Sequence, residues 1–514
     1  MKIIDLIESK YTSELTDRQV DAIGKLVEEM NQNNRSFYYR DLPTLSKLIS
    51  LIYNKISNGK LELLPELISL IKICDKPFLK EKTSDELIFV PKTVHLLNAI
   101  CEILQNDNSQ DEDIYMLFLE SMNFLNNFVA FGIDEYKNQE ADYQMKKMYG
   151  NNFSLLNTLQ NEGTRNLRLI SNSVVLETLV YIITNNVYNE NSTIVVVNSL
   201  LNCALFKLNA EKLAGLGVLK DLIQIISNTS DFRSLLVRVC IEAIWNILEN
   251  GGRIGCRMMA YEEIVNSLFY TFNTVIKNCF RLEDRNIRND ICILINYAVS
   301  SPESHIYFIY KDENASHDLN KKCFLEILLH YATYDETVSI QKEIEINIKE
   351  TNEVNSKIRG TMDPHDFFLS TSPDDIEFKK IIWTSILYII KDNHSKKEVR
   401  EILERYRFMS CLLLYLDPEG LKFSCITRWQ QPQLKDIQIL CLSILLNIIP
   451  LYQSMYNITI YLSSNRFEEI KGYSTLIKFL QIYSDKERRL LCLKTINNMI
   501  NSEFIKKELT EESK

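Results

Sequence analysis

The chain has 514 residues, of which only 13 are glycine and 10 are proline. This scarcity of turn residues argues against the many tight hairpins of β-sandwiches, barrels and propellers, while 46% hydrophobic and 25% charged residues exclude a mostly disordered chain. The formal net charge is −10 and no lysine or arginine block stands out, so we expect no nucleic-acid or membrane-surface binding.

Apolar residues recur at steps of three and four, the spacing that gathers side chains on one face of a helix. This spacing is found, in chain order, at 114–129, 236–248, 287–299, 378–389 and 437–449. The segment 194–208 is apolar on several sides and suits the inner position of a stacked helical pair, whereas 218–226 and 476–483 suit the outer position. Strongly buried helices begin at intervals of about 40 residues and more, as in armadillo and HEAT repeats. The sequence predicts an all-α, right-handed solenoid of degenerate armadillo- or HEAT-like repeats.

Two polar stretches interrupt this pattern. Residues 142–170 are expected to form a linker or loop, and the highly charged segment 334–375 is expected to be a flexible insertion. The predicted organisation is N-terminal helical repeats at 1–141, the linker at 142–170, central armadillo-like repeats at 171–333, the insertion at 334–375, C-terminal repeats at 376–503 and a polar tail at 504–514.

The twelve cysteines indicate a reducing compartment. None forms a C-x-x-C pair, and most stand among apolar residues, as Cys240, Cys292 and Cys441 do. They are therefore expected to be small buried side chains and not disulfides or zinc ligands. The first residues lack the apolar core of a signal peptide, and the longest apolar run, near 381–390, is too short to span a bilayer. The sequence predicts a soluble intracellular protein.

No motif of an active site or cofactor site stands out. The sequence has no G-x-x-x-x-G-K phosphate loop, no H-E-x-x-H zinc pair and no G-x-S-x-G nucleophile elbow. The glycines at 215–217 and 251–255 are expected to end helices, where glycine accepts a positive φ. We expect no catalytic residue, metal, cofactor or small-molecule substrate.

An enzymatic alternative rests on the dipeptides His317–Asp318 and His365–Asp366, which resemble the dipeptide of the all-helical HD phosphohydrolases. Those enzymes hold a metal pair with a histidine, the dipeptide and a later aspartate. Both dipeptides here stand in polar, loop-like sequence and not on a core helix that could fix the geometry of metal ligands. Chance surface pairs are the favoured interpretation.

Three residues are candidates for lining a binding groove. In EAIWNILEN, Glu242 to Trp245 resembles the third helix of an armadillo repeat, whose consensus places an asparagine in the groove. That place falls on Glu249 here and on Asn202 in VNSLLNCAL, so the asparagine series is incomplete. Core packing is the favoured interpretation of Trp245, as for the other two tryptophans, and groove lining is its alternative.

Five segments resemble the cilia- and flagella-associated protein 69 family and occur in the same order as in that family. They are CDKPFLKEKTSDEL (Cys74–Leu87), EAIWNILEN (Glu242–Asn250), RNIRNDICILI (Arg285–Ile295), DIEFKKIIW (Asp375–Trp383) and WQQPQLKDIQILCLSILLNIIPLY (Trp429–Tyr452). Family members continue well past residue 514, so the chain is expected to be a shortened relative or a partial gene product.

The resemblance implies an armadillo-like protein of the motile axoneme, in a projection of the central-pair microtubules. It would be a non-catalytic scaffold that contacts other projection proteins, associates indirectly with microtubules and supports ciliary beating. The alternative is a cytoplasmic adaptor that holds extended peptides through positions such as Asn202 and Trp245. A metal phosphohydrolase is the third hypothesis.

Overall fold

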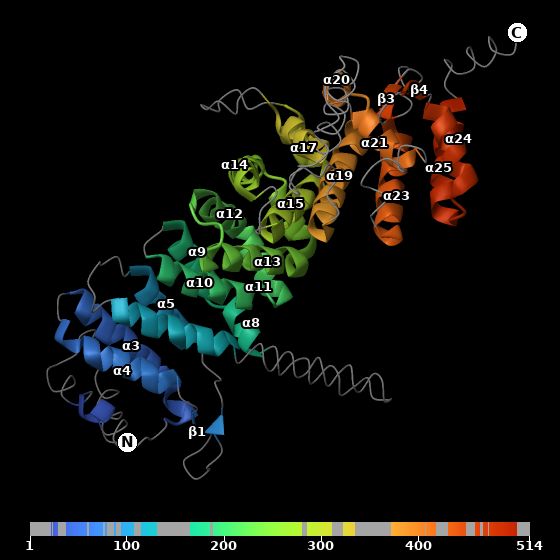
Figure 1. Ribbon diagram of the computed structural model, residues 1–514. Helices are drawn as coiled ribbons and strands as arrows, with labels where there is room; N and C mark the ends of the chain where they lie inside the picture. Colours follow the sequence, from blue (N-terminus) through green and yellow to red (C-terminus); the bar gives the residue numbers. More distant parts are fainter. Residues whose placement is uncertain are drawn as a thin grey trace, which may run out of the picture. The chain divides into compact units, whose positions relative to one another are not determined.

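The computed structural model divides the chain into two compact units, Met1–Met258 and Met259–Lys514. Each is built from helices that pack on their neighbours in sequence (Figure 1). The described residues are 22, 24–28, 37–58, 61–75, 78–79, 87–88, 94–106, 115–130, 165–185, 189–279, 285–310, 322–334, 372–406, 408–417, 430–448, 458–462, 466–470 and 472–500.

In the first unit a helical segment at 24–28 precedes two short 3₁₀ turns that each lead into a helix. Its elements are η1 (Tyr39–Asp41), α3 (Leu42–Ser57), η2 (Leu61–Leu63), α4 (Leu64–Asp75), α5 (Val94–Asn106), a helical segment at 115–130, α8 (Arg165–Ser171), α9 (Val175–Asn185), α10 (Glu190–Cys203), α11 (Lys207–Gly215), α12 (Val218–Asn228) and α13 (Leu235–Met259). Helix α9 lies at the centre of this unit, because it contacts α5, α10, α11 and α12.

The second unit contains a row of stacked helices. Its elements are α14 (Glu262–Cys279), α15 (Arg285–Val299), η3 (Pro302–Ser304), α16 (His305–Ile309), α17 (Phe324–Ala332), α19 (Pro373–Asn393), α20 (Lys397–Arg405), α21 (Phe408–Leu416), α23 (Gln431–Ile448), α24 (Gly472–Ile482) and α25 (Lys486–Ile500). Helix α15 contacts α19, α19 contacts α23, and α23 contacts α25. These four helices form an inner row, and α17, α21 and α24 pack against it.

Local sequence explains where several helices begin and end. Asn189 begins α10, because its Oδ1 accepts a hydrogen bond from the Ser192 amide at 3.0 Å. Glu326 reaches back to the Cys323 amide at 2.8 Å and closes a capping box on α17. Of the glycines predicted to end helices, Gly217 and Gly252 have positive φ of 83° and 52° and interrupt helices as expected, whereas Gly251 and Gly255 lie in helical segments. The element α13 therefore contains a break at Gly252.

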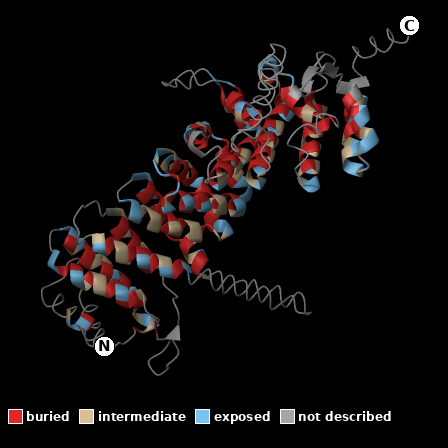
Figure 2. Cartoon of the chain, viewed as in Figure 1, coloured by how far each residue is buried: buried red, intermediate tan, exposed pale blue. Residues whose placement is uncertain are grey.

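The core follows the helical spacing seen in the sequence. Figure 2 shows buried residues concentrated where helices face one another, with exposed residues along the outer turns. In α15 the isoleucines, leucine, alanine and valine at steps of three and four are buried, and in α23 Ile437, Cys441, Ile444 and Leu445 are fully buried. The all-α fold class is confirmed.

Two short antiparallel hairpins interrupt the helices and were not predicted. Strand β1 (Phe78–Leu79) pairs with β2 (Leu87–Ile88), and β3 (Ile458–Leu462) pairs with β4 (Arg466–Ile470). The second hairpin is rich in β-branched and aromatic residues, ITIYL and RFEEI, which favour strands. Segments of two to five residues are too short for a period-two pattern to stand out from helical sequence.

The predicted single helix at 194–208 is wrong, because α10 ends at Cys203 and α11 begins at Lys207. No glycine or proline marks the break. The amides of Leu205 and Phe206 bond to carbonyls three residues earlier, and Phe206 is extended. The turn lets α11 bury Asn209, Ala210, Leu213 and Ala214 and contact α8, so tertiary packing overrides local propensity.

The predicted linker and insertion lie largely outside the described residues, as does the tail at 504–514. Helix α8 occupies 165–171, at the end of the predicted linker, and α19 starts at Pro373, inside the predicted insertion. Proline at the first helical position and Asp374 and Asp375 in the first turn are signals that favour this start. The remaining domain boundaries stay a prediction.

Candidate functional site

The three predicted groove residues lie on α10 and α13. Asn202 is in the last turn of α10 and is half-buried. Trp245 and Glu249 are one helical turn apart on α13, with Trp245 half-buried and Glu249 exposed. Their role in binding stays a prediction, since the geometry fixes only their exposure and their contacts.

Trp245 carries an unsatisfied polar group. Its indole Nε1 is buried and finds no hydrogen-bond partner among the described residues. A buried donor without a partner costs about 1–3 kcal/mol, so native proteins seldom leave one without a reason. A fully packed core tryptophan behaves differently here: Trp383 is completely buried and its Nε1 donates to the Ala332 carbonyl at 3.1 Å.

The residue that joins α13 to α10 is Asn246, which the sequence analysis did not single out. Its Nδ2 donates to the Leu201 carbonyl at 3.3 Å, beside Asn202. The next asparagine, Asn250, donates back to the Asn246 carbonyl at 3.0 Å. The hydrogen bond between α13 and α10 is therefore made by Asn246, next to Trp245, and not by the residue at position 249. In the sequence, Asn246 is visible as the second polar residue of EAIWNILEN, which could have pointed to this contact.

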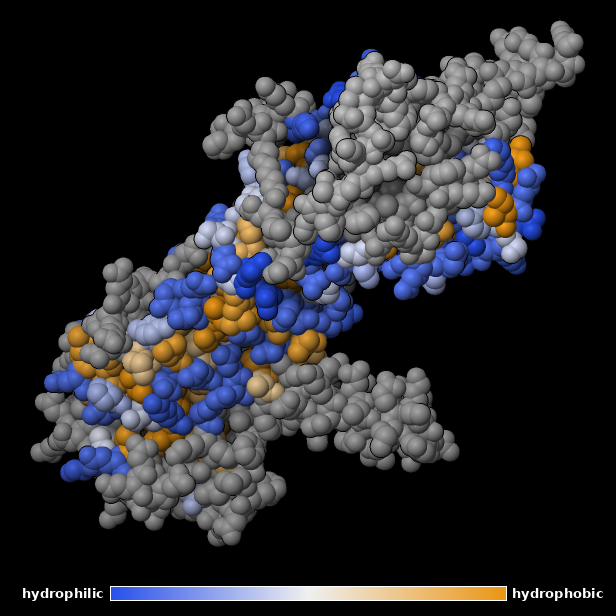
Figure 3. Space-filling view, viewed as in Figure 1, coloured by the Kyte–Doolittle hydropathy of each residue, from blue (hydrophilic) through white to orange (hydrophobic). Residues whose placement is uncertain are grey.

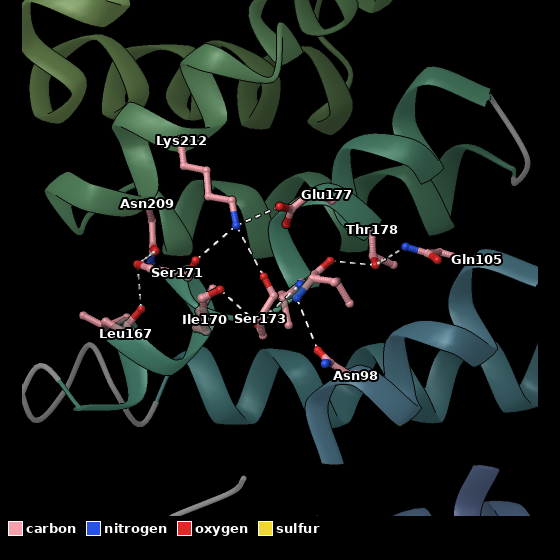
Figure 4. A network of polar contacts seen from close by, with 12 residues as sticks. Asn98, Gln105, Leu167, Ile170, Ser171, Ser173, Glu177, Thr178, Asn209 and Lys212 are labelled. Carbon is pink, nitrogen blue, oxygen red and sulfur yellow. Dashed lines mark hydrogen bonds and ion pairs between the residues drawn. The ribbon is translucent and has the colours of Figure 1, made fainter. Parts of the chain in front are cut away.

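A denser polar network lies in the same unit around Lys212 of α11 (Figure 4). The Lys212 Nζ lies 2.8 Å from Glu177 Oε1 and donates to the carbonyls of Ser171 and Ser173 at 3.0 and 3.3 Å. Ser171 also bonds to the side chain of Asn209. The amine is therefore held by one carboxylate and two carbonyls at the corner between α8 and α9. This arrangement fixes the corner and leaves no amine poised as a nucleophile.

The second unit contains a buried ion pair between two segments that resemble the family. Arg288 of α15 is 1% exposed, and its Nη1 lies 2.8 Å from Asp375 Oδ1 at the start of α19. Its Nη2 donates to the Asp374 carbonyl at 3.0 Å, as does Asn289 Nδ2. The guanidinium also lies over the Phe378 ring, 4.2 Å from its centroid. These contacts hold the first turn of α19 against α15.

The described histidines and acidic residues do not assemble a metal centre. Within the described ranges no three His, Cys, Asp or Glu side chains are grouped so as to hold a metal ion. The buried His305 is held by protein partners, because Nε2 lies 2.8 Å from the Val299 carbonyl and Nδ1 2.9 Å from Asn393 Nδ2. The dipeptides His317–Asp318 and His365–Asp366 lie outside the described residues.

The ten cysteines whose side chains the structure describes are free thiols, and all of these but the half-buried Cys256 are buried. Burial raises the pKa of the Cys101, Cys203 and Cys240 thiols to about 12. At neutral pH these groups are protonated and poorly nucleophilic, as expected of cysteines that fill the core. The described helices include none that is both long and apolar enough for a membrane span.

Comparison with known proteins identifies the family to which this helical architecture belongs. The family model described as cilia- and flagella-associated protein 69, ARM repeat, matches residues 1–467. The chain belongs to that family. The armadillo-repeat fold expected from the sequence is thereby confirmed, as is the cilia- and flagella-associated family to which its segments pointed.

The curated relatives are distant and longer. The cilia- and flagella-associated protein 69 of Homo sapiens is 22% identical over 458 residues, which cover 88% of this chain and 41% of the human protein. The proteins of Papio anubis and Mus musculus give the same identity and coverage. The chain thus spans less than half the length of these relatives.

Two solved structures are similar at low identity. A crystal complex of SYS-1 and POP-1 is 11% identical with a TM-score of 0.37, covering 96% of this chain and 71% of that one. A structure from work on a phosphorylation switch between cadherin and beta-catenin is 10% identical with a TM-score of 0.21, covering 97% and 98%.

Proposed function

We propose that the chain is a non-catalytic scaffold of the motile axoneme, in a projection of the central-pair microtubules, where it supports beating through contacts with other projection proteins. The observation that carries this proposal is the family match over residues 1–467, on a chain built of stacked helices. Stacked helical repeats offer long surfaces to several partners at once.

The polar groups of the described helices support a scaffold more than an enzyme. Lys212 and Arg288 are both engaged in holding helices together, and burial keeps the thiols of Cys203 and Cys240 protonated. The net charge of −10 disfavours direct contact with the acidic tubulin tails. Association with microtubules is therefore proposed to run through partner proteins.

The test is the fate of the epitope-tagged chain in fractionated cilia. Axonemes would be isolated with detergent from cells with a complete axoneme and from cells that lack the central pair. We expect the tagged chain to stay with complete axonemes and to be lost from those without a central pair. Complete release into the detergent-soluble fraction would contradict an axonemal scaffold, and equal retention in both axonemes would contradict the central-pair position.

One observation favours the adaptor as a second candidate. The buried, unpartnered Nε1 of Trp245 lies on the same helix as the exposed Glu249, with Asn246 bonded to the helix of Asn202. An extended peptide carries a carbonyl at every residue, and one of these could satisfy the indole donor once the side chains that cover Nε1 move aside. A peptide array would test this: an adaptor should select short motifs, and Trp245→Phe, which removes the donor but keeps a ring, should abolish the selection.

A further inference from the structure

Helix α25, the last described helix of the inner row, carries an apolar face that no other described helix covers. Helix α25 exposes Leu490 and Leu493 by 50% and 52%, and the neighbouring α24 exposes Ile477 and Ile482 by 44% and 58%. Leu490 and Leu493 follow Lys486 and precede Asn497 at steps of four, three and four, which places all four on one side of α25. We call Lys486, Leu490, Leu493 and Asn497 the α25 face. Figure 3 shows hydrophobic atoms among hydrophilic ones at this end of the unit.

The other inner helices show what such a face is built to do. Each of α15, α19 and α23 packs between two helices: α15 between α14 and α19, α19 between α15 and α23, and α23 between α19 and α25. Every leucine and isoleucine of these three helices is buried or half-buried. Helix α25 contacts α23 through its other side, where Cys492 and Thr495 are fully buried. Leu490 and Leu493 thus lie on the side of α25 that, in the preceding inner helices, packs against the next helix of the row. No described helix covers them.

Basic side chains outnumber acidic ones beside the α25 face. Arg489 directly precedes Leu490 and Lys494 directly follows Leu493, so these two exposed side chains lie on opposite edges of the α25 face. Lys486 is a third basic residue and lies on the face itself. Of the two acidic groups nearby, Asp485 lies 3.0 Å from Lys435 Nζ of α23, and Glu487, which is 61% exposed, lies 4.0 Å from the same atom. An apolar stripe with basic flanks is complementary to a helix with an apolar stripe and acidic flanks.

We propose that the α25 face docks an amphipathic helix with acidic flanks from a partner protein, packed on α25 as α25 packs on α23. A second copy is disfavoured, because a symmetric contact would bring Lys486, Arg489 and Lys494 against their own equivalents. The face lies beyond residue 467, where the family match ends, and this inference does not depend on the axonemal role.

The test uses the purified full chain and two synthetic helical peptides of about 20 residues, long enough to form helix. Both carry leucines at steps of three and four, with glutamates flanking the stripe in one and lysines in the other. Fluorescence anisotropy is expected to show binding of the glutamate peptide at least about tenfold tighter than of the lysine peptide, a difference of about 1.4 kcal/mol. The double variant Leu490→Asp/Leu493→Asp is expected to lose the glutamate peptide.

Charge reversal separates docking from damage to the fold. The triple variant Lys486→Glu/Arg489→Glu/Lys494→Glu is expected to prefer the lysine peptide, and an unfolded protein could not show such an inverted preference. Leu235→Asp, at an equally exposed leucine of the first unit, is the matched control and should bind as the unmodified chain does. Absence of binding to either peptide, or equal binding to both, overturns the proposal. A concentration-dependent dimer in sedimentation that Leu490→Asp/Leu493→Asp abolishes would instead assign the face to a second copy.

Discussion

At the scale of single residues, Trp383 shows how one side chain joins several elements. Its ring is fully buried, meets Phe408 and Tyr415 edge-on with centroids 5.8 and 5.2 Å away, and bonds to the last carbonyl of α17. Lys379 Nζ donates to the same carbonyl at 3.3 Å. The end of α17 is therefore satisfied by two donors from α19.

Trp383→Phe should lower the free energy of unfolding by about 1 kcal/mol or more, because the hydrogen bond is lost and part of the ring volume is vacated. Trp383→Ala should cost about 3–5 kcal/mol. Urea unfolding followed by circular dichroism measures both. Tyr388→Ala, at an exposed ring of the same helix, is the control and should change stability by less than about 0.5 kcal/mol. Equal midpoints for Trp383→Ala and the control would mean that this ring is not in the core.

Asp485 gives a residue-scale pH dependence. Its hydrogen bond with Lys435 and the one it accepts from the Arg488 amide lower the pKa of its carboxyl below the ordinary value of 3.8. Because the folded-state pKa is the lower one, the stabilisation is present above pH 3.8 and is lost as the pH falls through the folded pKa. Asp485→Asn keeps a capping side chain but does not titrate. Thermal melts from neutral to acid pH should show the gap between the two proteins closing in acid; a gap that stays constant would contradict this.

At the scale of elements, the junction of α15 and α19 depends on a buried pair of charges. Arg288→Met should lower the free energy of unfolding by about 3–5 kcal/mol, because the buried Asp375 carboxylate loses its 2.8 Å partner. Arg288→Met/Asp375→Leu should recover part of that loss, since neither charge of the buried pair remains, while Arg285, whose Nε lies 3.6 Å from Asp375 Oδ1, is 31% exposed and can be solvated. Lys397→Met, in an exposed pair with Glu401, is the control and should cost less than about 1 kcal/mol. A double variant as unstable as the sum of the single ones would show that the two groups act independently.

Element positions could be predicted where side-chain periodicity is long and apolar. The strongly buried helices expected at 236–248, 287–299, 378–389 and 437–449 are found as α13, α15, α19 and α23, because one face of each is buried against neighbours. The break at Ala204 and the two hairpins could not be predicted, since both depend on tertiary packing or on segments too short to carry a period. For the candidate site, the sequence pointed to Trp245 but not to the hydrogen bond from Asn246 to the Leu201 carbonyl. A polar asparagine in a helix can cap a helix end, bond to water or bond to a neighbouring helix, and the sequence does not distinguish these roles.

At the scale of the whole molecule, the two units share one construction, in which helices bury apolar faces and polar groups fix the corners. Lys212 does this in the first unit and Arg288 in the second. Membership of the cilia- and flagella-associated protein 69 family and the charge of −10 favour a scaffold that meets microtubules through other proteins.

The most direct test of the central-pair scaffold is cryo-electron tomography of axonemes that carry the chain with a gold-binding or bulky tag, compared with axonemes that lack it. We predict that the added density lies on a projection of the central pair and that its removal deletes density there. Added density on the outer doublets, or an unchanged central pair when the chain is absent, would contradict the proposed function.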